Sequence, residues 1–267
     1  MRFRESDVVA NLLLNVETEE FGKAVAVCRP PAAEFGASAW EIRRADPEGG
    51  RKGFTVSLFL SCPVAEAESP EEALRRAVLP VALEYRLDVG ALEIHGKPGE
   101  GGYADLPFDD REVGGYLVYG LLAAPGGGET RAATYVTRPD FTPRADSDLV
   151  SRVHLRLPVA DPGRALDRCA PIVAATRASV VQVVSARAAG RSDELCEVAL
   201  LSAVPAVEGE AEEDGLRRVA TALAAGLGLD GRPVTVRGSS AELVLEPGEA
   251  EVESLSVRVE DDPLYVD

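Results

Sequence analysis

The strongest constraint on the fold is a similarity between two stretches that each lead from a predicted strand into a predicted helix. The tripeptide Pro-Val-Ala precedes both helices, which begin at Pro70 and Pro162. In each helix, alanine, leucine and arginine follow the first proline at the third, fourth and sixth positions, and a second proline, Pro80 or Pro171, lies in mid-helix. An interior proline costs a helix roughly 3 kcal/mol, so its occurrence in both helices predicts an internal duplication. The alternative is that strand-to-helix junctions converge on proline and capping residues.

The elements around this similarity predict an α+β fold. From residue 152 to residue 237 the expected order is β-α-β-β-α-β, the order of a ferredoxin-like sandwich. We therefore expect two related ferredoxin-like halves with antiparallel sheets and with helices packed on one face. The first half is assigned to residues 1–145, an incomplete repeat with extra strands, and the second to residues 150–267, with an acidic tail. The segment 138–149, rich in proline and aspartate, is the predicted boundary.

Individual elements are predicted from capping residues and from hydrophobic periodicity. Ser69, the proline after it and Glu72 form a capping box, and we expect the helix that follows to bend or end at Pro80. Further helices are expected at residues 161–176 and 216–227. Apolar or alternating runs predict strands at residues 7–17, 23–29, 54–60, 91–95, 116–124, 152–159, 179–186, 195–203, 233–236 and 243–245, with a further edge strand at 257–259. The strands at 233–236 and 243–245 are candidates for one hairpin.

The charge of the chain is strongly negative, at -17 for 267 residues. The stretch from Pro205 to Asp267 has 15 acidic and 5 basic residues, so the acidity concentrates in the last quarter. Such a surface opposes contact with phosphate backbones, and the chain has no basic cluster, so we expect no nucleic-acid partner. The acidic region predicts either a solvated surface or an electrostatic face for a basic protein partner.

Several sequence features predict the compartment and the source. No run of 18 apolar residues is present, and the charged N-terminus lacks the apolar core of a signal peptide, so we expect a cytoplasmic protein without membrane association. The abundance of alanine, glycine, proline and arginine indicates a bacterium with GC-rich DNA. The four cysteines are far apart and form no C-x-x-C pair. We therefore expect them to be reduced core residues, with no metal site and no cofactor.

The two histidines are the weak candidates for catalysis. His154 alternates with apolar residues in a predicted strand, on the same side as Arg152 and Arg156, which are candidate ligand-binding residues. His95 ends a predicted strand before a glycine-rich loop, where functional residues are often displayed. For each histidine the alternative is a surface position or an ordinary place in the sheet.

The segment 154–166 resembles the opening of a vicinal-oxygen-chelate, or glyoxalase-type, module. In that family a histidine of the first strand, here His154, can bind a divalent metal. The resemblance covers 13 residues of 267. The rest of the chain departs from the family, because such modules need βαβββ units and a helix follows the second later strand here. The match is therefore interpreted as a shared strand-to-helix junction.

Two interpretations of function remain open, and the sequence does not decide whether the chain is an enzyme. The first is a non-enzymatic interaction or assembly module of the bacterial cytoplasm, with a protein partner or a second copy of the chain. Leu264 and Tyr265 would then be apolar anchors of a terminal docking peptide, unless that end simply frays. The alternative is a small-molecule enzyme or ligand-binding protein with a pocket between two pseudo-symmetric halves, lined by carboxylates, Arg152, Arg156 and His154.

Overall fold

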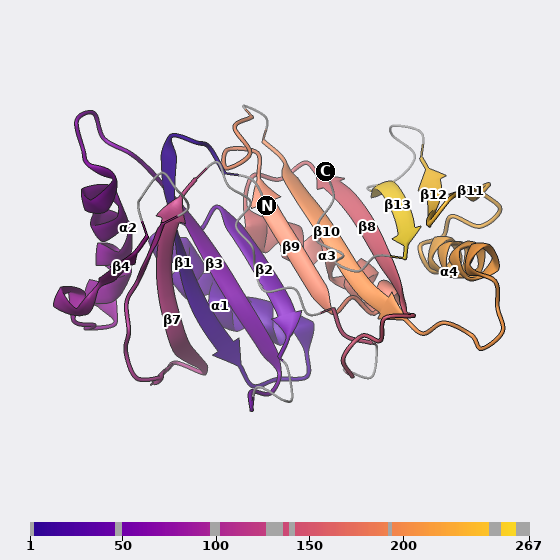
Figure 1. Cartoon of the computed structure of the whole chain (residues 1–267), viewed down its shortest axis with the longest axis horizontal. Helices are drawn as coiled ribbons and strands as arrows, with labels where there is room; N and C mark the ends of the chain where they lie inside the picture. The colour runs from indigo at the N-terminus through magenta and orange to yellow at the C-terminus, as the bar shows by residue number, and fades with distance from the viewer. Residues whose placement is uncertain are drawn as a thin grey trace.

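The chain folds around one large sheet (Figure 1). The computed structural model describes residues 3–45, 50–96, 102–126, 136–138, 142–191, 194–245 and 252–259. Within these ranges the protein has four α-helices and a 13-stranded sheet, and every strand pairing is antiparallel. The predicted α+β class with antiparallel pairing is therefore confirmed. None of the described helices has both the length and the apolar character that crossing a bilayer requires.

All four α-helices are 15 residues long. They are α1 (Phe21–Phe35), α2 (Pro70–Glu84), α3 (Pro162–Thr176) and α4 (Glu212–Gly226). The strands are β1 (Asp7–Val16), β2 (Ala39–Arg44), β3 (Phe54–Pro63), β4 (Glu93–His95), β5 (Tyr103–Asp105), β6 (Arg111–Val113), β7 (Tyr116–Pro125), β8 (Leu149–Leu157), β9 (Val180–Ser185), β10 (Cys196–Val204), β11 (Thr235–Arg237), β12 (Ser240–Val244) and β13 (Val252–Arg258).

The strand order divides the sheet into two runs that meet at its centre. The first run is β2-β3-β1-β7 and the second is β9-β10-β8-β13. The two runs join where β2 pairs with β9, and we call this strand pair the seam. Short strands extend both ends, with β5 and β4 beyond β7 and with β12 and β11 beyond β13. The sheet is therefore continuous from one half of the chain to the other.

The helices cover one face of this sheet (Figure 1). Alternation along each strand directs one set of apolar side chains to that face, where Leu12, Leu58 and Leu200 are buried with Leu74 of α2 and Leu166 of α3. A smaller cluster packs α4 against β8, β12 and β13. Burying this apolar surface is the main stabilising contribution to such a fold.

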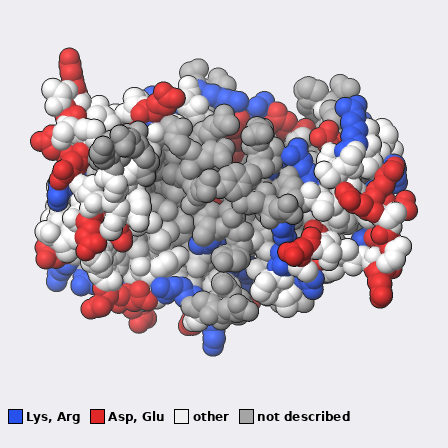
Figure 2. Space-filling view, in the orientation of Figure 1, with Lys and Arg blue, Asp and Glu red and all other residues white. Residues whose placement is uncertain are grey.

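The opposite face, which we call the helix-free face, has two smaller apolar clusters. The first cluster comprises Phe3, Val9, Ala39, Phe59 and Ala188. The second cluster comprises Val136, Val150, Val180, Leu201 and Ala203. On the side of the molecule seen in Figure 2, acidic side chains gather at both ends of the sheet, near α2 and near α4. Acidic side chains thus gather near α2 as well as near α4, which belongs to the acidic last quarter of the sequence.

The strand predicted at residues 23–29 is wrong because this stretch belongs to α1. Pro30 and Pro31, which directly follow this stretch, also lie inside the helix. The buried residues Ala24 and Cys28 are one turn apart, which is a helical spacing. Packing on the sheet and on α3 therefore outweighs the two missing backbone donors.

The element order predicted for residues 152–237 is confirmed by β8, α3, β9, β10, α4 and β11, but the last of these strands does not pair within the run. The fourth strand of the second run is β13, which pairs with β8. The sequence predicted only an edge strand there. The hairpin predicted from the strands at 233–236 and 243–245 is confirmed as β11 and β12, and it lies outside β13. Propensity indicates that a segment is a strand, but it does not identify the strand's partner.

The predicted match between the helix after Pro70 and the helix after Pro162 is not confirmed. Helix α2 follows β3 and packs on β1 and β7, whereas α3 follows β8 and packs on α1, β9 and β10. The two helices thus occupy different places in their strand orders. The capping box at Ser69 is confirmed, but α2 continues past Pro80 to Glu84. Pro80 is exposed, so water can satisfy the carbonyl group left without a partner.

Candidate functional site

The candidate site lies on the helix-free face, where the pleat of β2 and β9 places polar side chains. In β2, Trp40 and Ile42 are buried on the helix face, so the side chain of Glu41 between them projects to the opposite face. In β9, Val181 and Val183 likewise direct Gln182 to the helix-free face. The same alternation applies to the neighbouring strands.

Four polar residues lie in one row that crosses the seam. Glu41 of β2 is opposite Ser57 of β3 on one side and opposite Gln182 of β9 on the other. Beyond Gln182, the row continues through Ala199 of β10 to His154 of β8. We call Ser57, Glu41, Gln182 and His154 the polar row. Neighbouring strands are about 4.8 Å apart, so the row crosses roughly 20 Å of the sheet.

Glu41 is the unusual member of the polar row. Its side chain is 1% exposed, and one carboxylate oxygen, Oε2, accepts a hydrogen bond of 2.8 Å from Nε2 of Gln182. The other oxygen, Oε1, has no hydrogen-bond partner among the residues that the structure describes. Burial raises the pKa of Glu41, while the hydrogen bond from Gln182 and the charge of Arg43 act in the opposite direction. An unpaired buried acceptor is costly and requires an explanation.

Arginine and tyrosine side chains lie beside Glu41. Arg43 is two residues along β2, and its Nε donates a 2.9 Å hydrogen bond to Oγ1 of Thr55. Arg51 lies 4.0 Å from the ring centre of Tyr119. Burial raises the pKa of the Tyr119 hydroxyl, and the nearby Arg43 lowers it. The carboxylate of Glu41 therefore lies close to a phenol that stays protonated at neutral pH.

The residues predicted on β8 project from the helix-free face. His154 is partly buried, and burial, followed by the charge of Arg152, lowers its pKa, so it is uncharged at neutral pH. Arg156 forms ion pairs with Glu197 at 3.5 Å and with Glu253 at 2.9 Å. The structure thus brings the predicted residues of β8 to the same face as Glu41, with His154 in the polar row itself.

His95 is remote from this site. It lies on β4, where its ring stacks on Tyr103 at 4.9 Å and its Nε2 is 3.6 Å from a carboxylate oxygen of Glu93. Seven strands separate β4 from β8, which corresponds to roughly 35–40 Å. The two histidines therefore do not share a site. Leu264 and Tyr265 lie outside the described residues.

The cysteines do not form a reactive group. Cys28, Cys169 and Cys196 are buried, and burial raises the pKa of each thiol to about 12. A thiolate, the form that reacts and binds metals, is thus disfavoured. The described parts of the chain contain no group of three or more histidine, cysteine or acidic side chains placed to hold a metal ion.

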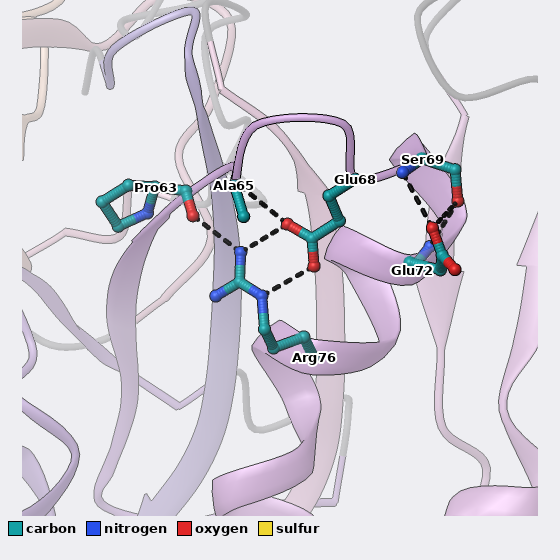
Figure 3. Close-up of polar contacts among 6 residues, drawn as sticks. All are labelled: Pro63, Ala65, Glu68, Ser69, Glu72 and Arg76. Atoms are coloured by element: carbon teal, nitrogen blue, oxygen red, sulfur yellow. Dashed lines mark hydrogen bonds and ion pairs between the residues drawn. The ribbon is translucent and has the colours of Figure 1, made fainter.

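A second polar cluster lies where β3 leads into α2 (Figure 3). Nε and Nη2 of Arg76 donate hydrogen bonds of 2.7 and 2.8 Å to the two carboxylate oxygens of Glu68, and Nη2 also donates to the carbonyl oxygen of Pro63 at 2.6 Å. The backbone N–H of Ala65 donates to Glu68 at 2.9 Å. The pKa of Glu68 is lowered to about 2, and the hydrogen bond from Arg76 is the largest cause. We call the pair Glu68–Arg76 the first clip.

The same arrangement recurs where β10 leads into α4. Nε and Nη2 of Arg218 each donate a 2.8 Å hydrogen bond to Glu210, and the pKa of Glu210 is lowered by this contact. We call Glu210–Arg218 the second clip, and each of its residues lies 142 positions after its counterpart in the first. Both carboxylates are fully engaged by arginine. The clips therefore fix the loop to the helix and are not available for chemistry.

Two cavities lined by described residues lie away from the polar row. One, of about 280 Å³, is beside the β2–β3 connection and is lined by Arg44, Arg51 and Lys52 together with Glu19. Arg44 is paired with Glu19 at 3.0 Å, and Arg51 is paired with Asp110 at 3.2 Å. The other, of about 240 Å³, is at the start of α4. Neither contains a predicted site residue.

Comparisons with known proteins give no match to a family model, to a curated protein or to a solved structure. The site must therefore be interpreted from its own geometry. Sequence reasoning missed Glu41 and Gln182. The available signal was the pattern of Ala39–Arg44, in which charged residues alternate with Trp40 and Ile42.

Proposed function

We propose that this protein binds a small molecule at the polar row on the seam. The observation that carries the proposal is the free Oε1 of Glu41, a buried acceptor without a partner among the described residues. Buried polar groups are nearly always hydrogen-bonded, and exceptions are frequent at functional sites. This is the second of the two interpretations that the sequence left open.

We further propose that the two halves are ferredoxin-like units related by duplication, with a correspondence that differs from the one the sequence suggested. Residues 7–44 correspond to 148–185 at a spacing of 141, and residues 54–84 correspond to 196–226 at a spacing of 142. The first range contains β1, α1 and β2, and its counterpart contains β8, α3 and β9. Both runs of strands have the 2-3-1-4 order when numbered within their own half.

Local details support this correspondence. Helices α1 and α3 both have cysteine as their eighth residue, Cys28 and Cys169, and proline as their tenth, Pro30 and Pro171. Both end on a residue in the left-handed conformation. The two clips lie at the matching positions of the other helix pair, α2 and α4. Prolines in helix interiors are costly, so a repeated one is informative.

The duplication gives the seam a special position. Glu41 and Gln182 are counterparts at the spacing of 141, and they also face each other across the seam. A pseudo-twofold axis would therefore pass between these two side chains. Interfaces between related units are frequent ligand sites. The two apolar clusters are counterparts too, because Phe59 corresponds to Leu201 and Val9 to Val150, so matched apolar groups flank the polar row.

The interaction function remains a second candidate because α2 exposes apolar side chains. Leu79 is 39% exposed and Leu83, one turn later, is 64% exposed. Their counterparts on α4 are Thr221 and Ala225. Sedimentation equilibrium of the wild type and of Leu83→Lys tests self-association through this helix. A dimeric wild type and a monomeric variant would support an interaction function through α2. A monomeric wild type would rule out self-association through this helix.

The binding proposal is tested by native mass spectrometry of the purified chain, which detects a retained small molecule by its mass. We expect a ligand adduct on the wild type that Glu41→Gln loses. Glu197→Gln is the matched control, since Glu197 lies on the same face but is engaged by Arg156 and Arg191. The control should keep the adduct. A wild type without any adduct, or an adduct that survives in Glu41→Gln, would refute binding at the seam.

A further inference from the structure

We infer that the exposed side of α2 binds a basic amphipathic segment of another protein, which packs apolar side chains on Leu79 and Leu83 and places lysine or arginine beside the neighbouring carboxylates. This inference rests on the interaction candidate for α2, names the class of its partner and is independent of binding at the seam. Of the five exposed large apolar side chains in the described parts of the chain, three lie in residues 64–84, and Leu83 is the most exposed of all at 64%.

Leu79 and Leu83 form one apolar ridge on the outer side of α2. Residues four apart in a helix are neighbours on its surface. The inner side of α2, which includes Leu74 and Val78, is already buried against β1 and β7. The ridge is therefore not needed to pack the helix on the sheet. Apolar side chains that lie together on a surface mark an interaction site, and a helical partner can lay its own apolar side along such a ridge.

Two carboxylates lie at the same end of α2 as the ridge. Glu84, which follows Leu83, and Glu34, near the end of α1, are both exposed. Burial, followed by the hydrogen bond with Tyr116, raises the pKa of Tyr85, and the charges of Glu34 and Glu84 raise it further, so both carboxylates act at this point. Neither carboxylate has an ion-pair partner among the residues that the structure describes. A carboxylate in the last turn of a helix is also opposed by the helix dipole, which a basic partner would offset.

The basic residues near this end of α2 leave the surface negative. Arg86 follows the helix, and Arg111 donates a hydrogen bond to the carbonyl oxygen of Tyr85. Residues 64–95 contain seven acidic and three basic side chains, and inclusion of Glu34 and Arg111 gives eight and four. Acidic side chains also gather near α2 in Figure 2. The surface therefore favours a basic partner and opposes a second copy of the chain, which has the same negative charge.

The second half lacks every part of this surface. Helix α4 has the length of α2 and packs on β8 and β13, which hold the places of β1 and β7 in the other run. In the proposed correspondence, the four residues have small or uncharged counterparts, namely Thr221 for Leu79, Ala225 for Leu83, Gly226 for Glu84 and Ala175 for Glu34. The clips, in contrast, recur in both halves. The ridge and its carboxylates are therefore not a requirement of folding such a helix onto the sheet.

Fluorescence anisotropy at physiological ionic strength, with three labelled helical peptides of equal length, tests the inference. The first peptide has leucine on one side and lysine on the other, the second has glutamate in place of lysine, and the third has serine in place of leucine. We expect the wild type to bind the leucine–lysine peptide at least ten times more tightly than either of the others. Leu83→Lys should lose at least a factor of ten in this affinity, because it removes the centre of the ridge.

The matched control is Ala225→Lys, which adds the same charge at the corresponding exposed position of α4. It should change the affinity for the leucine–lysine peptide less than twofold. Glu84→Gln should lower this affinity about threefold, the size of one exposed charge pair. Equal affinity for the three peptides, or a loss in Ala225→Lys as large as that in Leu83→Lys, would overturn the inference.

The outcomes separate the partner class from the interaction function. If sedimentation equilibrium shows a wild-type dimer that Leu83→Lys dissociates, the interaction function stands and the partner is a second copy of the chain. If the wild type is monomeric and shows no preference for the leucine–lysine peptide, the interaction function and its partner class both fail. Binding at the seam is tested separately, by the adduct that Glu41→Gln should lose.

Discussion

The two halves of the sheet agree where contacts hold the fold together and differ where the polar row crosses the seam. Both halves have the same strand order, helices of 15 residues and a Glu–Arg clip before the second helix. At the seam, the position held by Glu41 in one half is held by Gln182 in the other. The comparison suggests that the clips serve folding, whereas the carboxylate at the seam serves another purpose.

The polar row shows the same asymmetry at its other members. In the proposed correspondence, His154 matches Leu13 and Ser57 matches Ala199. Each half thus contributes two polar side chains, but only Glu41 and Gln182 occupy equivalent positions. A purely structural row at a twofold axis has no need for this difference. An asymmetric ligand lying across the axis would meet different groups in the two halves.

The largest expected effect comes from the equivalent core leucines, Leu58 and Leu200. Both are fully buried on the helix face. Leu58→Ala and Leu200→Ala should each lower the free energy of unfolding by about 2–5 kcal/mol, because each leaves a cavity in the core. Since one sheet joins the halves, both variants should shift a single unfolding transition, as followed by circular dichroism in urea. Two separate transitions, each sensitive to only one variant, would show that the halves unfold independently.

The clips should have a smaller effect that depends on pH. Folding lowers the pKa of Glu68 to about 2 from an ordinary value of 4.5, so the clip stabilises the protein above pH 4.5 and the contribution is lost as pH falls toward 2. Glu68→Gln should be less stable than the wild type at pH 7, and the difference should diminish in this window. Glu210→Gln should behave in the same way. The measurement is thermal unfolding from pH 2 to pH 7, and a constant difference would contradict the account of the clip.

The smallest expected effects come from residues in the left-handed conformation. Ala67 has φ of 66° where its counterpart is Gly209, and Arg86 has φ of 53° where its counterpart is Gly228. Glycine adopts this conformation without the steric penalty, which is roughly 1–2 kcal/mol for other residues. Allowing for the greater flexibility of unfolded glycine, Ala67→Gly and Arg86→Gly should each stabilise the protein by about 0.5–1 kcal/mol. A loss of stability in urea titrations would show that these loops are not equivalent to their counterparts.

Local signals in the sequence were enough for some of these features. The capping box of Ser69 and Glu72 correctly predicted the start of α2, and alternation correctly placed His154, Arg152 and Arg156 on one side of β8. These predictions depend on residues close together in the chain, where backbone geometry sets the outcome.

Features that depend on distant pairing could not be predicted in this way. The hydrogen bond between Glu41 and Gln182 depends on the seam, whose paired residues are 141 positions apart, and no local pattern identifies that pairing. The internal correspondence that we propose was hidden by Pro30 and Pro31, which are typical of the end of a helix or strand but lie inside α1. If residues 23–29 are interpreted as a strand, α2 becomes the first helix of the chain. Its two prolines then match the two prolines of α3.

The most direct test of the central claim, that Glu41 is present for binding and not for folding, is the stability of Glu41→Gln without ligand. Folding raises the pKa of Glu41, so the wild type loses stability as pH rises from 4.5 through the raised value. At pH 8 the variant, free of this buried charge, should be more stable than the wild type by about 1–2 kcal/mol in urea unfolding. The gain should shrink toward pH 4.5. A variant less stable than the wild type at pH 8 would show that Glu41 holds the seam together, which contradicts the account.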